Sequence, residues 1–532
     1  MKRHPKNLSL ALALAPLPLA LVACGPEGAP FDVGTPGLGT LERPDTPGNG
    51  LQFNFEPGEV VESHPSPGGQ FLIHFTRNGL NAVPKTDADM SGTPDFVEQV
   101  ASVYDEVITH YQSMGFRPPT SDQGLPDNGG DGKFDVYLVD FAGIGDGVFQ
   151  VDSCGPAKPD ICTGYMVQEN DYVGYGYPST LIANRILGSH ELFHGIQAAY
   201  DHGQGSVFAE GSAVWATESF DPSLKDFEYF LDGFFANTGR SLDVPLPGPV
   251  DPFSYGAGIF FQFLEERYGD GTMRTLLEHT EDNAFGVADP AWIQELDPVL
   301  KTVATTDFAS AFVEFATWNL FTDKHADPAR GYTNGAGYPP VQMEAVNAPY
   351  TELTRLFYAG SQYFRVDPAG RAQMTAALAA PAGSEAELEN LVMLQVVEKN
   401  GVYGPVSRFD TPFMAVDPLD TTGADALVVV LVNTAITGNS KRPTLCIGSP
   451  EEVETCKAAV VPPGSGAGGG GGAGGGGAGG NGADPGGDDG CGCSLMPQSP
   501  NPGIFILIGL SAFVYRRVRR RKTGTSAANT TP

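Results

Sequence analysis

One short stretch of this chain carries two histidines and a glutamate in the spacing His190-Glu191-x-x-His194, which is typical of a metal-binding helix. Residues four apart on a helix lie on one face, one turn apart, so both imidazoles can bind one Zn²⁺. Glu191 is then placed to act on a metal-bound water as general base. The alternative is a helix with two surface histidines and a solvated glutamate. Apolar residues at helical spacing favour a helix with one buried face: Ile182, Ile186, Phe193, Ile196 and Tyr200.

A zinc site of this kind needs a third protein ligand and leaves its fourth position to water. Glu210 follows an intervening turn, at the start of a second expected helix, and is the candidate. His202 comes just past the first helix and is poorly placed. Glu218 is ~12 Å further along the second helix than Glu210, so both cannot bind the same ion directly. We therefore expect Glu218 to support a zinc-binding histidine from behind, with a surface glutamate as the alternative.

The pattern His190-Glu191-x-x-His194 followed by Ala209-Glu210-Gly211 resembles the gluzincin metallopeptidases. The resemblance implies zinc held by His190, His194 and Glu210, with Glu191 as general base. Tyr255 resembles by position the residue that stabilises the oxyanion opposite the zinc in such enzymes. A wider series over residues 60 to 345 is similar to a metalloprotease family of myxobacteria: Asp87-x-Asp89, Gly130-Asp131-Gly132-x-Phe134-Asp135-Val136-Tyr137-Leu138 and Tyr255-Gly256-x-Gly258.

Two departures from known zinc peptidases limit what the resemblance implies. Metzincins carry a histidine six residues after the second ligand, where this chain has Tyr200. Thermolysin-type enzymes carry an aspartate four residues after the glutamate ligand, where this chain has Val214. The substrate does not carry over from the resemblance.

A second candidate metal site precedes the zinc motif. Oxygen-bearing side chains follow the spacing of an EF-hand loop, with Gly92 at the sixth position. They are Asp87, Asp89, Ser91, Asp95 and Glu98. Glu98, at the twelfth position, can bind Ca²⁺ through both oxygens. The expected preceding element is a strand, so the pattern is at most half an EF-hand, and a solvated turn is the alternative.

A weaker copy of this loop lies before the expected strand 134–141. Asp131, Gly132 and Asp135 match loop positions five, six and nine, after Asp127 at position one. Leu138 stands where the terminal glutamate is needed. A solvated turn fits this copy as well as a metal site does.

The composition indicates an acidic, mostly globular protein. The chain of 532 residues is long enough for two or three domains, and its formal net charge of −32 argues against nucleic acid as a partner. We expect an α+β zincin-like metallopeptidase domain at 61–345, followed by a β-sandwich domain at 346–460. The strand-like runs 373–378, 391–397 and 426–432 indicate the β-sandwich. Linkers rich in Pro and Gly, or in Gly alone, are expected at 25–60 and 461–490.

Both ends of the chain carry export signals. Residues 1–24 have basic residues, an apolar run and a lipobox-like end at Cys24, whose resemblance to bacterial lipoprotein signals implies lipidation there. An ordinary signal peptide is the alternative. Residues 491–532 combine Cys491 and Cys493, a short apolar run and an arginine cluster. This tail resembles the C-terminal sorting tail of myxobacteria, which implies processing near Cys491 and display at, or release from, the cell surface. A plain tail anchor is the alternative.

Four further cysteines form two local pairs, Cys154 with Cys162 and Cys446 with Cys456. An exported protein meets an oxidising compartment, so we expect both pairs to form disulfides. Zinc ligation is the alternative, although neither pair has His or Cys neighbours in the sequence.

Together these features predict an exported zinc endopeptidase acting on protein or peptide substrates at the surface of a Gram-negative bacterium. Calcium is the second expected cofactor. One alternative is a zincin-like surface protein that binds a partner without hydrolysis. Another is a zinc hydrolase acting on non-peptide substrates. The presence of Glu191 favours an enzyme, because a protein that only binds has no need of a general base.

Overall fold

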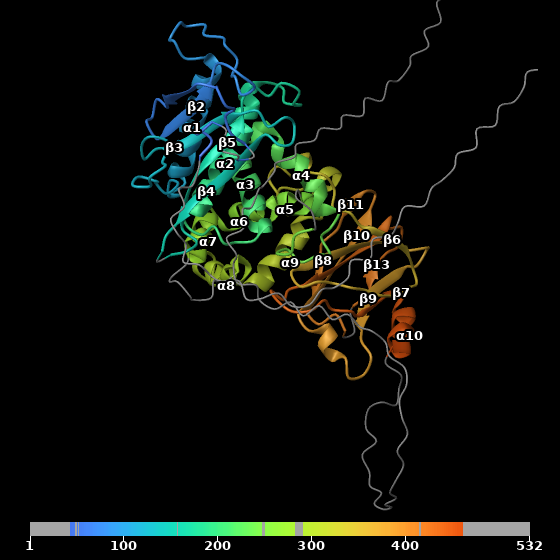
Figure 1. The fold of residues 1–532 in the computed structure, drawn as a ribbon. Coiled ribbons are helices and arrows are strands. Elements are labelled where there is room, and N and C mark those ends of the chain that lie inside the picture. Colours follow the sequence, from blue (N-terminus) through green and yellow to red (C-terminus); the bar gives the residue numbers. More distant parts are fainter. Residues whose placement is uncertain are drawn as a thin grey trace, which may run out of the picture. The chain divides into compact units, whose positions relative to one another are not determined.

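The computed structural model describes residues 43–47, 51, 53–156, 158–246, 251–281, 291–413 and 417–460. A mixed sheet comes first, drawn in blue and cyan in Figure 1, with strand order β1-β2-β3-β5-β4. β2, β3 and β5 are parallel neighbours, whereas β1 and β4 run antiparallel at the two edges. The strands are β1 (Val61–Pro65), β2 (Phe71–Thr76), β3 (Phe134–Val139), β4 (Gly147–Cys154) and β5 (Cys162–Glu169).

The two faces of this sheet are buried against different partners, as the alternation of side chains in a strand requires. Val136 and Leu138 face helices α1 (Asp95–Ser113) and α2 (Thr180–Ala198) in the main core. Tyr137 and Val139 point to the opposite face, where aromatic residues from the segment before β1 cover them. The sheet therefore holds α2, the helix of the zinc motif, on one side only.

A run of helices follows α2 and shares its core. The longer ones are α3 (Ser206–Phe220), α4 (Asp226–Phe235), α6 (Gly258–Tyr268), α7 (Thr272–Thr280), α8 (Trp292–Val303) and α9 (Phe308–Trp318). The short ones are α5 (Pro252–Gly256), η1 (Pro222–Leu224), η2 (Asp323–His325) and η3 (Gly335–Gly337).

The C-terminal region is largely β and has two sheets around a shared core. One sheet has the order β11-β10-β14-β8-β6, with β12 beside β10, and the other β13-β9-β15-β7. The strands are β6 (Glu344–Asn347), β7 (Tyr350–Leu353), β8 (Gly360–Asp367), β9 (Gln373–Ala379), β10 (Leu391–Lys399), β11 (Val402–Tyr403), β12 (Ser407–Phe409), β13 (Leu419–Asp420), β14 (Ala426–Asn433) and β15 (Thr444–Gly448). The short helices η4 (Glu385–Leu388) and α10 (Pro450–Val460) complete the region.

Strand β14 joins the two halves of the described chain through its two faces. Leu427, Val429 and Leu431 point into the core between the two sheets. Val428, Val430 and Val432 belong to the core shared with the helices. A strand buried on both faces reads as a continuous apolar run, as Ala426–Asn433 does.

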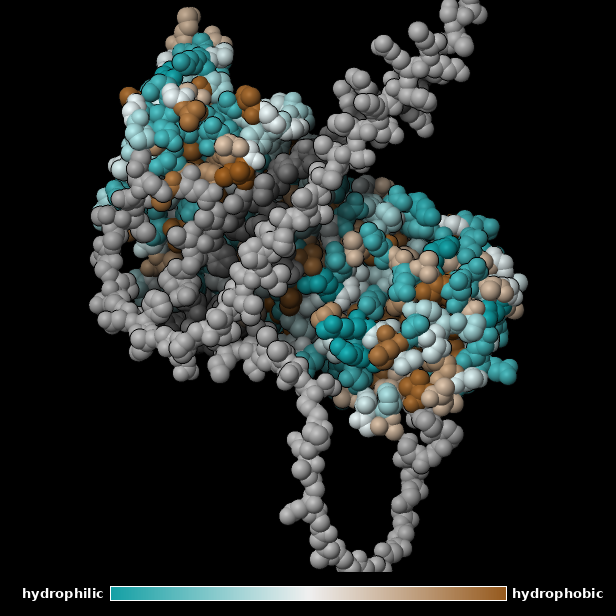
Figure 2. All heavy atoms as spheres, turned by 45° about the vertical axis from the view of Figure 1, so that its right-hand side comes forward, coloured by the Kyte–Doolittle hydropathy of each residue, from teal (hydrophilic) through white to brown (hydrophobic). Residues whose placement is uncertain are grey.

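Of the expected α+β zincin-like domain and β-sandwich domain, the structure confirms the coarser order: a mixed sheet with helices, then a largely β region with two sheets. The strands expected within 373–378, 391–397 and 426–432 are present as β9, β10 and β14. None of the described helices is long and apolar enough to cross a membrane. Figure 2 shows brown residues scattered singly among hydrophilic ones over the face it presents.

Candidate metal centre

Helix α2 carries three of the predicted site residues on a buried surface. The Ser179 hydroxyl begins the helix by accepting a hydrogen bond from Ile182 N at 3.2 Å. His190, Glu191 and His194 are 8%, 6% and 6% exposed. Buried polar groups cost free energy unless they are paired, so the partners of these three side chains decide what the site can do.

Glu210 meets both histidines from α3. Its Oε2 lies 3.3 Å from His190 Nε2 and 3.7 Å from His194 Nε2. The ligand atoms of the three residues all lie within 4.8 Å of one another. Two atoms bound to a tetrahedral zinc are about 3.4 Å apart, so a small movement of the side chains would bring all three to one ion. Glu210 Oε1 is buried without a hydrogen-bond partner in the described part of the chain. The donor set, its spacing and this unpartnered oxygen fit a zinc ion.

The electrostatics of the cluster also favour a cation. Burial lowers the pKa of His194 to about 4, so it is neutral at pH 7, the form in which imidazole binds metals. Burial acts in the same direction on His190, but its hydrogen bond with Glu210 and the charge of Glu191 raise its pKa to about 9. Burial opposes ionisation of Glu210, yet the two histidines leave the pKa of this carboxyl below its usual value. The pocket thus stabilises positive charge beside an ionised Glu210.

Glu191 links the zinc motif to the edge of the first sheet. Its Oε2 accepts a hydrogen bond from Phe149 N on β4 at 3.0 Å. A Cβ added to Gly147 on the same strand would lie 2.6 Å from Leu187 Cδ1 and 3.3 Å from Glu191 Cγ, so a larger residue there would require neighbouring side chains to shift. Burial raises the pKa of Glu191 to about 8, a value suited to exchanging protons near neutral pH.

Tyr255 lies in the same site, on α5. Its ring stacks on His190, with centroids 5.7 Å apart and 7° between the planes, and packs against Phe230 at 4.9 Å on a tilt of 31°. Asp251 caps α5 by accepting a hydrogen bond from Phe253 N at 2.9 Å. Burial, and next the charge of Glu210, raise the pKa of the Tyr255 hydroxyl well above 10, so it remains a hydrogen-bond donor.

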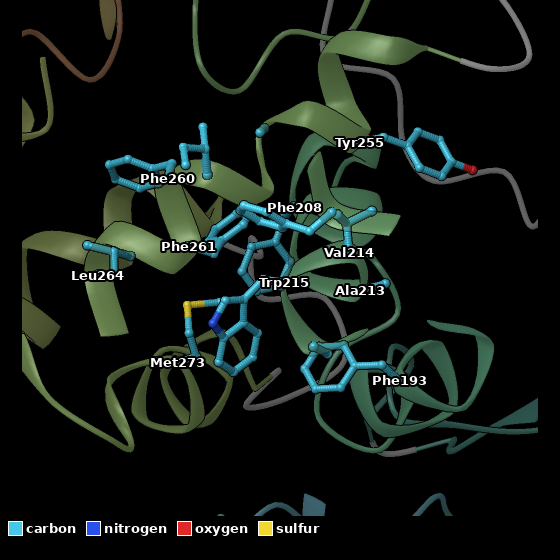
Figure 3. Packing of buried hydrophobic residues seen from close by; sticks show 14 of the residues in the cluster. Phe193, Phe208, Ala213, Val214, Trp215, Tyr255, Phe260, Phe261, Leu264 and Met273 are labelled. Atoms are coloured by element: carbon cyan, nitrogen blue, oxygen red, sulfur yellow. The ribbon is translucent and has the colours of Figure 1, made fainter. Parts of the chain in front are cut away.

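Close packing of α3 holds Glu210 and Tyr255 together. A Cβ on Gly211 would lie 2.8 Å from Phe261 Cε2 and 3.0 Å from Ser254 O, so the residue beside Glu210 must be small. Figure 3 shows the aromatic cluster behind this contact, with Trp215 of α3 among rings from α2 and α6. The hydroxyl of Tyr255 points away from that cluster. The site is therefore built on the margin of a rigid aromatic core.

Gln197 is a functional residue that the sequence reasoning missed. Its Oε1 is hydrogen-bonded to His194 Nδ1 at 2.8 Å, which leaves Nε2 of that histidine to face Glu210. Its Nε2 donates to Ala209 O and to Ser212 Oγ, both at 2.8 Å. One amide thus fixes the ring of one ligand and the start of the helix that carries another. The only signal in the sequence is its position one turn after His194.

Glu218 lies elsewhere on α3. It is 5% exposed, and burial followed by the charge of Glu228 raises its pKa to about 7. Lys225 is its nearest opposing charge among the causes of that shift. No hydrogen bond joins Glu218 to His190 or His194 within the described residues. The support of a histidine that was expected from Glu218 comes instead from Gln197, which contacts His194.

The loop before α1 brings Asp87, Asp89 and Asp95 together with ligand atoms within 4.8 Å of one another. Ser91 N donates to Asp87 Oδ1 at 3.0 Å and to Asp89 Oδ1 at 2.9 Å. The Ser91 hydroxyl donates to Glu98 Oε1 at 2.7 Å, so all five predicted oxygen-bearing residues belong to one loop and the helix it opens. The residues of this cluster are half-buried or exposed, whereas those of the zinc candidate are buried.

The weaker copy of this loop is engaged by cations of the chain itself. Asp131 forms an ion pair with Lys133. Asp135 is buried and pairs with both Arg43 and His74, the latter at 2.7 Å. Asp135 therefore serves as the partner of a buried arginine. Among the described residues, no metal-like cluster forms at this loop.

Both predicted disulfides are present, Cys154–Cys162 across the end of β4 and β5 and Cys446–Cys456 between β15 and α10. They agree with an oxidising compartment. Cys24, expected to be lipidated, and Cys491 and Cys493, expected in the sorting motif, lie outside the described residues, as do the expected signal peptide, Gly-rich linker and tail.

Comparison with protein-family models gives no match for this chain, and comparison with curated protein sequences gives none either. The assignment of function therefore rests on the chain's own residues and geometry.

Proposed function

We propose that this protein is an exported zinc-dependent endopeptidase of gluzincin type, with His190, His194 and Glu210 as zinc ligands. The observation that carries the proposal is the buried cluster of these three side chains with Glu191 beside it. A zinc ion held there supplies Lewis-acid activation of water and of the scissile carbonyl.

The remaining chemistry belongs to residues of the chain. Glu191 takes a proton from the attacking water and returns it to the leaving amine, and the hydrogen bond from Phe149 N holds its carboxylate in place. Tyr255 keeps its proton and donates a hydrogen bond to the oxyanion that develops on the carbonyl oxygen. Gln197 holds the His194 ring in place throughout.

The edge of the first sheet favours a peptide as substrate. β4 is an edge strand with β5 as its partner in the sheet, and Phe149 N faces Glu191. An extended peptide that adds to such an edge gains main-chain hydrogen bonds and lies alongside the catalytic glutamate. A non-peptide substrate has no use for this row of backbone groups.

We further propose that the loop of Asp87, Asp89, Ser91, Asp95 and Glu98 binds Ca²⁺ and stabilises the start of α1. The proposed route to the cell surface uses lipidation at Cys24 and processing near Cys491, so that membrane and sorting machinery are the expected partners besides substrates.

The test is cleavage of casein and of a proteome-derived peptide library by the exported, zinc-loaded chain. Hydrolysis should stop with phenanthroline and return when zinc is added. The library also defines the cleavage preference. A folded, zinc-loaded protein that cleaves no peptide would instead be a surface binding protein, or a zinc hydrolase of other substrates.

A further inference from the structure

Three arginines line one cavity of about 510 Å³ at the junction of the helical and β regions. Arg240 follows α4, Arg355 follows β7 and Arg442 precedes β15, so the cavity is assembled from segments far apart in the sequence. The chain has 63 acidic and only 31 basic side chains. A cavity lined by three arginines is therefore unusual in a chain whose net charge is strongly negative.

Two of these arginines are held in place by the cavity wall. Arg355 Nε donates to Ser440 Oγ at 3.2 Å, and its guanidinium lies over the Phe357 ring at 4.6 Å. Arg240 Nη2 donates to Pro245 O at 3.4 Å. Because these guanidinium groups are already held in place, the side chains lose less conformational entropy when a ligand binds them.

The donors that arginines offer select the class of ligand. The acceptor that guanidinium groups bind best is an oxyanion, which takes two parallel hydrogen bonds from one fork.

Charge within the cavity is not balanced by the protein. Glu387 is the one carboxylate among the lining residues, and it accepts a hydrogen bond from the backbone N of Arg442. Asp243 lies close by and remains charged, although its Oδ1 accepts a hydrogen bond from the Ser241 hydroxyl at 2.7 Å. Three arginines thus stand against two carboxylates, Glu387 and Asp243, and the site keeps a net positive charge.

We propose that this cavity binds a multiply charged oxyanion, with a phosphate group as the best-matched head group. Three forks offer more donors than the two oxygens of a single carboxylate can accept, whereas a phosphate presents three or four oxygens. Val244 and Phe357 give the cavity an apolar wall for the remainder of the ligand. Because the arginines come from both regions, a bound anion would tie the helical region to the β region.

The test is calorimetric titration of the full exported chain with pyrophosphate, and separately with citrate, at constant ionic strength. Saturable binding of pyrophosphate is expected, with Arg355→Gln and Arg442→Gln each weakening it at least ~10-fold. Arg442→Lys keeps the charge but loses the planar guanidinium group, so its affinity for pyrophosphate should lie between those of the wild type and Arg442→Gln. Arg408→Gln removes an exposed arginine that pairs with Asp410 outside the cavity and should bind like the wild type. Tighter binding of citrate than of pyrophosphate would retain an oxyanion site but overturn phosphate as its head group.

The proposal is independent of the zinc chemistry, because none of these arginines belongs to the metal centre. The variants should therefore keep the zinc content and any peptidase activity of the wild type, which also reports that they fold. Absence of saturable binding of both anions, or unchanged affinity for pyrophosphate in both Arg355→Gln and Arg442→Gln, would overturn the proposal.

Discussion

The two candidate metal sites of this protein are built in opposite ways. His190, His194 and Glu210 are at most 8% exposed and sit between two helices. Asp87, Asp89 and Asp95 lie on a surface loop that backbone amides hold in shape. Burying ionisable groups costs free energy that only close partners offset, whereas exposed carboxylates are paired by water at little cost.

The difference shows where a binding site acquires its precision. At the buried site, both histidines are fixed by a further contact: Gln197 on His194, and Tyr255 stacked on His190. At the loop, the side chains depend on local turns within a few residues. We therefore expect substitutions behind the buried ligands to matter, and the loop to tolerate changes outside its five oxygen-bearing residues.

The largest effect is expected from removing a ligand of the buried site. Glu210→Ala should lower zinc affinity more than ~10²-fold, since roughly a third of a binding free energy of about 10 kcal/mol is lost. Metal analysis of the purified chain, which should hold about one Zn²⁺ in the wild type, measures this. Full zinc content in Glu210→Ala combined with loss in Glu218→Ala would reverse the ligand assignment.

A substitution behind the ligands should have the next largest effect. Gln197→Leu removes both the acceptor for His194 Nδ1 and the link to α3, so zinc affinity should fall ~10- to 100-fold. Glu218→Gln is the matched control on α3 and should leave the affinity unchanged. Equal losses in the two variants would mean that general destabilisation, and not the contact with His194, sets the affinity.

The surface loop should give the smallest effect, seen in stability. Calcium at 100 times its dissociation constant adds about 2.7 kcal/mol to the free energy of unfolding, because it binds only the folded loop. The melting temperature should fall on calcium removal, and Asp89→Ala should abolish that difference. Asp131→Ala, in the loop whose carboxylates pair with Lys133 and Arg43, should keep it. An unchanged melting temperature of the wild type on calcium removal would show that the loop does not bind calcium.

The sequence predicted those parts of the site that depend on local spacing. His190 and His194 share a helix face by their separation alone, with Glu191 adjoining the first of them, and the calcium loop is equally local. Gln197 could not be singled out, because one turn of separation does not tell which neighbours a glutamine reaches across to α3. Glu218 was expected in this role for the same reason: its position on the helix does not show which residues its side chain reaches.

Contacts between residues far apart in the sequence could not be predicted from local sequence patterns. Asp135 was weighed as a calcium ligand, but its partner Arg43 is 92 positions away and comes from the segment before the first strand. Likewise, the apolar run of β14 predicted a strand, yet nothing local shows that its two faces enter different cores. Such pairings are set by the tertiary fold.

In the proposed function, the buried cluster activates water for peptide hydrolysis, and the decisive variant is Glu191→Gln. Glutamine has nearly the shape of glutamate but cannot accept the proton of the attacking water. Zinc content and melting temperature should stay near those of the wild type, with peptide hydrolysis reduced at least ~10²-fold. A zinc-loaded Glu191→Gln protein that hydrolyses peptides as fast as the wild type would contradict the assignment of Glu191 as the general base.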